Sequence, residues 1–237
     1  MYKRLLSHLQ STISRAKSHF SLTAIIAIIF LILSNQAYSY EPQKGDLLFQ
    51  DLNCGTLCNA ITTVTYGYHN TQISHVAMIV NTGKNPQVIE AIGDEVHLTA
   101  LSTFLLRSRD PSGNARVLVG RLKPQYQHLI PKAIKIALKW QGLPYNRTFN
   151  PDNQFEAFYC SELIYDAFML ANNGKPIFKL NIMTFKQNGK FLPEWVQYFK
   201  TQKAHIPEGK SGTNPGMMSR SKAIDIIYSY SNEMRKV

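Results

Sequence analysis

The stretch SHVAMIVNTGKNPQVIEAI, residues 74–92, decides the fold that we expect for this 237-residue chain. Two runs rich in valine and isoleucine, residues 74–80 and 87–92, flank the sequence NTGK at residues 81–84. Runs of β-branched residues favour strands, and Asn and Gly in the connection favour a tight turn. We therefore predict a β-hairpin over residues 75–92, in which the two strands run antiparallel.

His75 and Glu90 are the chemically notable residues of this hairpin. Glu90 lies in VIEAI, a strand that otherwise looks buried, and a buried unpaired carboxylate is costly, so it needs a partner or a wet cavity. If the register places Val80 opposite Asn85, His75 faces Glu90 on the same side of the sheet. The carboxylate could then orient the imidazole and stabilise its charged form. The alternative is that His75 is a structural residue at a strand edge.

The rest of the chain predicts further strands and several helices. Strand-like runs occupy residues 45–50, 96–101 and 115–122, and helical spacing of apolar residues occurs around residues 130–138, 155–171 and 222–234. Residues 206–221 are rich in Gly, Pro and Ser, which predicts a long ordered loop or lid. Strands in one block with helices around them favour an α+β fold. No repeat or long linker divides the chain after residue 40, so we expect one domain.

Cys160 lies near the N-terminal end of the helix predicted over residues 155–171. The helix dipole and the free backbone N–H groups there stabilise a thiolate, and the same N–H groups could receive an oxyanion. The alternative is a buried structural cysteine, because a free Cys packs as a small hydrophobe. Composition and spacing do not place Cys160 beside His75.

Three segments together resemble the permuted papain-like branch of the NlpC-type cysteine hydrolases, the YiiX-like family. They are GDLLFQ at residues 45–50, SHVAMIV followed by VIEA, and FYCSELIYDAF at residues 158–168. The resemblance runs from about residue 45 to residue 168. It implies a circularly permuted papain-like α+β fold, in which a small antiparallel β-sheet or partial barrel packs against helices. It also implies that Cys160 is the nucleophile, His75 the general base and Glu90 the residue that orients the base.

Several other residues belong to this comparison. Tyr159, Tyr145 and Ser74 flank the motifs and could line the substrate cleft, although tyrosine is also a common core residue. Asp46 is a motif residue that we expect to brace the fold. The CGTLC stretch (Cys54 to Cys58) and the GTNPG sequence at residues 212–216 fit the same subfamily pattern.

The spacing of Cys54 and Cys58 is compatible with two states. The two residues could form a disulfide in an oxidising compartment, or remain reduced on one helical turn. If they pair, Cys160 is the odd free thiol of the three cysteines, which favours the catalytic interpretation.

The N-terminal 39 residues are typical of a secretory signal. They carry four basic residues and no acidic one, followed by a twelve-residue apolar run at residues 22–33 and small residues at Ala37 and Ser39. An uncleaved membrane anchor is the alternative, although this run is short for a bilayer core of about 30 Å. Residues 40–237 are then an exported domain, in the periplasm or cell envelope of a bacterium.

The net charge of +11 does not by itself indicate nucleic-acid binding. Beyond residue 39 there are 22 basic and 15 acidic residues, a net charge of +7, and the lysines are scattered rather than arranged in one stripe. We expect a solvated basic face, with attraction to an anionic envelope surface as the second interpretation. Export excludes intracellular nucleic acid as a partner.

The sequence predicts neither a cofactor nor a metal. It has no Gly-rich phosphate loop and no HExxH motif, and His69 and His75 are six residues apart outside any predicted helix. Together with the N-terminal segment, the resemblance implies an exported thiol hydrolase that cleaves an amide bond through a Cys-His-Glu triad and an acyl-enzyme, because related NlpC-type enzymes cut such bonds. The expected substrate is a small peptide, an amino-acid amide or a peptidoglycan-type cell-wall fragment. The alternatives are a lipid or acyl-ester hydrolase or acyltransferase on the same fold, or a catalytically idle binding module.

Overall fold

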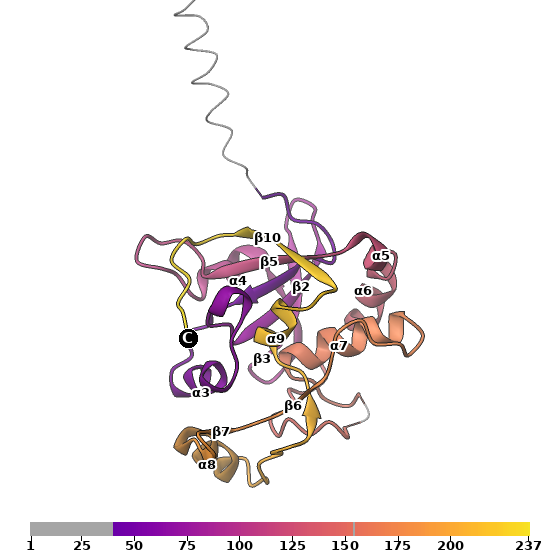
Figure 1. The fold of residues 1–237 in the computed structure, drawn as a ribbon. Helices are drawn as coiled ribbons and strands as arrows, with labels where there is room; N and C mark the ends of the chain where they lie inside the picture. Colours follow the sequence, from indigo (N-terminus) through magenta and orange to yellow (C-terminus); the bar gives the residue numbers. More distant parts are fainter. Residues whose placement is uncertain (1–39, 154) are drawn as a thin grey trace, which may run out of the picture. The chain divides into compact units, whose positions relative to one another are not determined.

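A six-stranded antiparallel sheet with the strand order β10-β5-β1-β2-β3-β4 forms the centre of the fold (Figure 1). Its strands are β1 (Leu47–Gln50), β2 (His75–Asn81), β3 (Gln87–Ile92), β4 (Glu95–Ala100), β5 (Val117–Leu122) and β10 (Ile224–Ser229). The five strands predicted between residues 45 and 122 are confirmed. Strands β1, β2 and β3 are almost wholly buried, which agrees with their apolar sequences.

The computed structural model describes residues 40–153 and 155–237. The expected secretory signal at residues 1–39 lies outside the described residues. Residues 42–237 form one compact unit, consistent with the α+β domain expected from the sequence. Within the described part of the chain, no helix is both long enough and apolar enough to cross a membrane.

The β2–β3 hairpin forms, but its predicted register was wrong by two residues. Met78 pairs with Ile89 and Ile79 with Val88, and an irregularity follows before the turn. Side chains alternate between the two faces of a strand, so a displacement of two residues keeps every side chain on its predicted face. His75 and Glu90 therefore still share one face, as diagonal rather than directly opposed neighbours.

The helices cover the sheet and extend the molecule at one end (Figure 1). They are α3 (Thr56–Val64), α4 (Leu101–Leu106), α5 (Pro124–Gln127), α6 (Ile130–Lys139), α7 (Cys160–Ala171), α8 (Pro193–Thr201) and α9 (Pro215–Ser219), with a short 3₁₀ turn η1 (Tyr68–Asn70). Helices α6 and α7 pack against each other and share the main apolar core with the sheet. The helix predicted around residues 130–138 is confirmed as α6, with Pro131 in its first turn.

Helix α7 is shorter than the predicted helix over residues 155–171. The carboxylate of Glu162, in its first turn, accepts the backbone N–H of Tyr159, which places the helix start at Cys160. Phe158, two residues before the helix start, is extended and forms a parallel β-bridge with Tyr145. The apolar residues before Cys160 thus pack in the core without continuing the helix.

The helix predicted over residues 222–234 was wrong. Residues 224–229 (IDIIYS) form strand β10, which pairs with the edge of β5. Its β-branched isoleucines favour a strand, and the unpaired edge of β5 supplies hydrogen-bond partners that an isolated amphipathic pattern cannot reveal.

A second, smaller apolar cluster lies beside α3 and α8. It contains Ala60 from α3, Met183 and Phe185, and Trp195 and Phe199 from α8. The two-stranded pairs β6 (Asn181–Ile182) with β9 (Ser211–Gly212), and β7 (Lys186–Gln187) with β8 (Lys190–Phe191), flank it. The predicted loop at residues 206–221 therefore contains a short strand and helix α9.

Asp46 braces the start of β1 through a bidentate ion pair. Its buried carboxylate accepts hydrogen bonds from Nε and an NH2 group of Arg121 on β5, at 2.8 and 2.9 Å. It also accepts the backbone N–H of Gln43 at 2.8 Å. Bidentate arginine–carboxylate pairs fix geometry as well as charge, so this contact holds the chain segment before β1 against the sheet.

We expect Asp46→Asn to lower the free energy of unfolding by about 2 kcal/mol, because it leaves the Arg121 charge without its carboxylate. The expected cost is below that of a fully buried pair, since the Arg121 side chain is one-quarter exposed. Urea unfolding measures this change. Asp225→Asn is the matched control, because its pair with Lys123 is largely exposed. An equal loss in both variants would contradict the bracing role of Asp46.

Candidate active site

The Cys160 thiol lies at the first residue of α7 and is 6% exposed. A backbone N–H at this position has no acceptor inside the helix, and the helix dipole places partial positive charge there. Among the described cysteines Cys160 alone is free, because Cys54 and Cys58 form a disulfide. The open alternative for that pair is thus resolved in favour of the bond.

A buried polar cluster fixes the position of this helix start. The Glu162 carboxyl group accepts Nδ2 of Asn146 at 3.0 Å, Nδ2 of Asn153 at 3.3 Å and the Tyr159 backbone N–H at 3.1 Å. Burial raises the pKa of Glu162 to about 8, although the hydrogen bonds from Asn146 and Tyr159 oppose this shift. The cluster ties the preceding loop to the first turn of α7.

The His75 imidazole and the Glu90 carboxylate are hydrogen-bonded to each other on one face of the sheet. Nε2 of His75 lies 2.6 Å from Oε2 of Glu90, and both side chains are almost fully buried. His75 is the first residue of β2, and Glu90 lies in the middle of β3. The sheet thus brings this predicted pair together even though the register differs from the expected one.

Glu90 has two further partners that sequence reasoning missed. Its carboxylate accepts the Thr99 hydroxyl at 2.5 Å and both NH groups of Arg107 at 2.6 and 2.7 Å. His97, opposite Glu90 on β4, lies 4.0 Å from the carboxylate. Burial alone would raise the pKa of Glu90, but the hydrogen bonds from His75 and Arg107 outweigh it and hold the pKa well below its usual range.

The contact of Thr99 with Glu90 could have been predicted from the sequence, whereas the contact of Arg107 with Glu90 could not. The β3–β4 hairpin, with a turn at Gly93, places Thr99 on the same sheet face as Glu90. Arg107 follows α4, and only the tertiary path of that short helix directs its guanidinium to the carboxylate. The need for a cation could nevertheless be inferred, because a buried carboxylate requires compensation.

Cys160 and Glu90 both act on the His75 imidazole. Burial alone would lower the pKa of His75, but hydrogen bonds to Cys160 and to Glu90 raise it to about 9. Because Nε2 is bonded to Glu90, the other ring nitrogen is the one left for the thiol. A histidine with this pKa carries its positive charge at neutral pH, between an acid and a sulfur.

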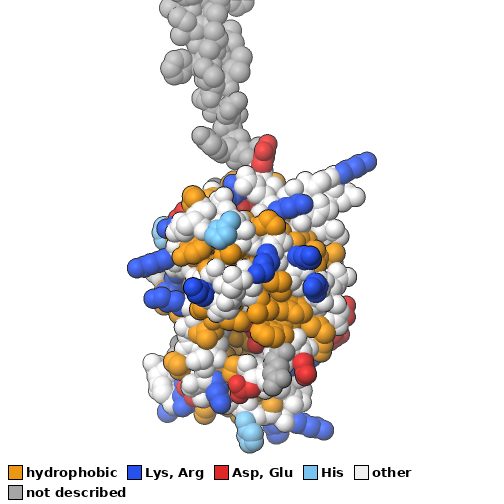
Figure 2. Space-filling view, turned by 90° about the vertical axis from the view of Figure 1, so that its right-hand side faces the viewer, with side chains coloured by type: hydrophobic (Ala, Val, Ile, Leu, Met, Phe, Trp, Pro, Cys, Tyr) orange, Lys and Arg blue, Asp and Glu red, His pale blue; other side chains and the backbone are white. Residues whose placement is uncertain are grey.

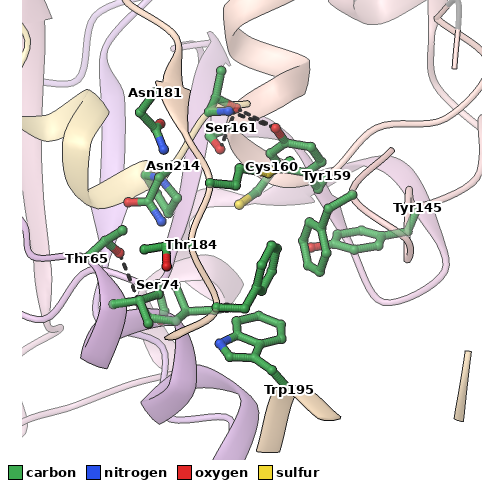
Figure 3. Close-up of a pocket in the computed structure, with 17 residues that line it drawn as sticks. Thr65, Ser74, Tyr145, Tyr159, Cys160, Ser161, Asn181, Thr184, Trp195 and Asn214 are labelled. Atoms are coloured by element: carbon green, nitrogen blue, oxygen red, sulfur yellow. Dashed lines mark hydrogen bonds between the residues drawn. The ribbon is translucent and has the colours of Figure 1, made fainter. Parts of the chain in front are cut away.

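A pocket with a cavity volume of about 70 Å³ lies beside the Cys160 sulfur (Figure 3). All three residues that the sequence proposed for a cleft, Tyr159, Tyr145 and Ser74, line it. The Ser74 hydroxyl also exchanges hydrogen bonds with the backbone of Leu52, so it supports the wall of the pocket. Of the remaining lining side chains, the apolar ones belong mostly to the second cluster or pack against it: Ile61, Val64, Phe149, Met183, Phe185, Trp195 and Pro215.

The GTNPG loop is a part of the site that the sequence did not place. The backbone N–H of Thr213 donates to the Tyr159 hydroxyl at 2.9 Å, and its side-chain hydroxyl bonds Ser161 at 2.9 Å. The loop is thereby attached to both neighbours of Cys160 in the chain. The next residue, Asn214, lines the pocket.

The described residues do not gather into a metal site. In residues 40–153 and 155–237, no group of three or more His, Cys, Asp or Glu side chains could hold an ion. The Glu90 carboxylate, the acid nearest to His75, already accepts hydrogen bonds from three side chains. The residues around Cys160 therefore do not fit a bound metal, and we derive no step that uses one.

A known protein is similar to this chain in sequence, and a solved structure is similar to it in fold. The chain is 29% identical over 146 residues to an uncharacterised protein of Escherichia coli strain K12, YiiX, which covers 62% of this chain and 67% of YiiX. A solved structure, described as metalloprotein YiiX from Escherichia coli O157:H7, superimposes with a TM-score of 0.62 at 22% identity. The superposition covers 80% of this chain and 98% of the solved chain, and it shows that the two proteins have the same fold.

A family model covers nearly the whole described domain. It matches residues 41–228, which include β1, the β2–β3 hairpin, α7 and the GTNPG loop. Its description is permuted papain-like amidase enzyme, YaeF/YiiX, of the C92 family. The sheet that carries His75 and Glu90 precedes the helix that carries Cys160, as the permuted order requires. The chain belongs to this C92 family of permuted papain-like amidases.

Proposed function

We propose that this protein is an exported cysteine amidase in which Cys160, His75 and Glu90 act as a catalytic triad. One observation carries the proposal: the only described free thiol stands at a helix N-terminus and interacts with a histidine that is bonded to a buried carboxylate. Membership of an amidase family supports cleavage of an amide bond by a thiol. The pocket beside the sulfur combines apolar side chains with a few polar groups, as small-molecule sites do.

The proposed reaction has two halves. The Cys160 thiolate attacks the amide carbonyl carbon, the new C–S bond forms, and the carbonyl electron pair moves to oxygen as an oxyanion. When the oxyanion collapses, the C–N bond breaks and the leaving amine takes the proton of the His75 imidazolium. Water then attacks the thioester while His75 accepts its proton, and collapse releases the carboxylic acid and restores the thiolate.

Glu90 serves this cycle by remaining ionised. Arg107 and Thr99 hold its carboxylate in place, so that it accepts the N–H of His75 in a fixed direction. This contact orients the ring and stabilises the imidazolium that forms with the thiolate. We infer that Thr99 and Arg107 are positioning residues that act through Glu90.

The proposed substrate is an amide in a small peptide, an amino-acid amide or a peptidoglycan-type cell-wall fragment. A second candidate is hydrolysis or transfer of a lipid or other acyl ester, which the apolar lining of the pocket favours. A panel of muropeptides, aminoacyl amides and acyl esters, assayed with wild-type protein, discriminates between them. If no member of the panel is cleaved and the Cys160 thiol also fails to react with iodoacetamide, the catalytically idle binding module is favoured.

We further propose that the protein is exported to the periplasm or cell envelope. The Cys54–Cys58 disulfide supports an oxidising compartment. Lysine and arginine side chains are spread over the face shown in Figure 2, around an area of hydrophobic surface. This distribution supports a solvated basic face that could also contact an anionic envelope surface.

Cys160→Ala is expected to abolish hydrolysis of every cleaved panel member, because it removes the proposed nucleophile and the described residues hold no other free thiol. The melting temperature should change little, since the substitution removes one sulfur from the wall of an open pocket. Thermal unfolding and the panel assay measure the two effects. A large loss of stability would instead support the structural interpretation of this cysteine.

His75→Ala is expected to slow alkylation of Cys160 by iodoacetamide at neutral pH, because the thiolate loses its imidazolium partner. Mass spectrometry of the labelled protein measures the rate. His97→Ala is the matched control: this histidine also lies near Glu90 but is one-third exposed and does not contact the thiol. Equal rates in wild type and His75→Ala would contradict the proposed pair.

The raised pKa of His75 predicts an alkaline limit to hydrolysis. Its charged form persists below a pKa of about 9 and is lost as the pH rises through that value. The leaving amine then loses its proton donor, so kcat/KM should fall about tenfold per pH unit above 9. Alkylation by iodoacetamide needs only the thiolate and should not fall there. A limit near pH 6.5 would show that Cys160 and Glu90 do not stabilise the imidazolium.

A further inference from the structure

The oxyanion of the proposed reaction needs more than one hydrogen-bond donor. The backbone N–H of Cys160 is one, because the first residue of a helix has no intrahelical acceptor. Hydrolysis by this route depends strongly on a second, pre-positioned donor near the attacked carbonyl. We therefore searched the pocket wall for a polar group that is both oriented and unbonded.

Most polar groups near the sulfur are already engaged. The Tyr159 hydroxyl accepts from Thr213, and the Ser161 hydroxyl is bonded to the Thr213 side chain. Nδ2 of Asn181 donates to the carbonyl of Ile182. Among the described residues of the wall, Nδ2 of Asn214 and the Tyr145 hydroxyl take part in no hydrogen bond, whereas the Tyr159 and Ser161 hydroxyls are already bonded to Thr213.

The orientation of the Asn214 amide is fixed by a helix cap. Its Oδ1 accepts the backbone N–H of Met217 at 3.2 Å at the start of α9. Because a backbone N–H can only donate, the oxygen must face α9 and Nδ2 must face the other way. In Figure 3 the amide nitrogen is on the side of Asn214 that faces Cys160, and the oxygen is on the far side.

The loop around Asn214 is packed too closely for its glycines to be replaced. A Cβ on Gly216 would lie 2.9 Å from the carbonyl oxygen of Tyr66 and 3.0 Å from Oδ1 of Asn214. A Cβ on Gly212 would lie 2.6 Å from the Met183 sulfur. Together with the bonds from Thr213 to residues 159 and 161, this packing holds the amide at a constant place relative to the helix start.

We propose that Nδ2 of Asn214 donates a hydrogen bond to the oxyanion, together with the backbone N–H of Cys160. This inference rests on the proposed function and names a further catalytic residue for it. The donor is set before substrate arrives, so no reorganisation is needed when the negative charge develops. Tyr145 is the weaker choice, because no contact in the described residues fixes the direction of its hydroxyl.

The test compares two reactions of the same thiol. Acylation by p-nitrophenyl hexanoate forms a tetrahedral oxyanion and releases coloured p-nitrophenolate, whereas alkylation by iodoacetamide displaces iodide and forms no oxyanion. Asn214→Ser keeps a good helix cap but removes the amide donor. We expect its acylation rate to fall about 100-fold, while its alkylation rate and melting temperature stay close to those of wild type.

Asn214→Asp sharpens the comparison, because it keeps the cap and the shape but replaces the donor with a carboxylate oxygen. We expect its acylation to be at least as slow as that of Asn214→Ser. Unchanged acylation in either variant would overturn the assignment. Equal losses of acylation and alkylation would also overturn it, since Asn214 would then support the thiolate or the fold.

Three outcomes separate this inference from the proposed function. If Tyr145→Phe shows the 100-fold loss of acylation and Asn214→Ser does not, the tyrosine hydroxyl is the donor and the Asn214 assignment is wrong. If the wild-type thiol reacts with neither reagent, Cys160 is not an activated nucleophile, and both proposals fail together. Normal alkylation with unaffected acylation in Asn214→Ser would reject Asn214 alone.

Discussion

The structure depends on one buried charge, the carboxylate of Glu90. This group is completely enclosed, and an uncompensated carboxylate there would be strongly destabilising. Its partners come from three places: His75 at the start of β2, Thr99 on β4 and Arg107 after α4. The need to satisfy this charge ties the edge of the sheet, a short helix and the proposed general base into one arrangement. A histidine held in this way keeps its position and its proton.

The other half of the site depends on where one helix begins. Glu162 accepts the N–H of Tyr159 and hydrogen bonds from two asparagines, so α7 starts at Cys160 rather than several residues earlier. That start places a thiol and a backbone N–H without an intrahelical acceptor at the pocket wall. Thr213 then joins the GTNPG loop to the residues on both sides of the cysteine. A shift of one residue at this helix start would rotate the thiol away from His75.

The apolar pocket arises where the two hydrophobic clusters meet. Cys160 belongs to the main cluster and Tyr145 packs against it, whereas Met183, Phe185 and Trp195 belong to the cluster beside α3 and α8. In Figure 3, Trp195 lies across the pocket from the Cys160 sulfur. A site between two packed layers excludes water from most of its walls, which strengthens any electrostatic contact made within it.

The sequence by itself determined the local features of this protein. Runs of β-branched residues predicted the five strands from β1 to β5, helical spacing predicted α6 and α7, and period-two alternation placed His75 and Glu90 on one face despite a wrong register. It could not predict that residues 224–229 complete the sheet, because a strand at an edge depends on a partner far away in the chain. For the same reason, the approach of Cys160 to His75, the Arg107 contact and the placement of Asn214 were decided only by the tertiary structure. Local patterns reflect backbone preferences and burial, whereas these contacts join residues from 17 to 85 positions apart that only packing of the whole domain brings together.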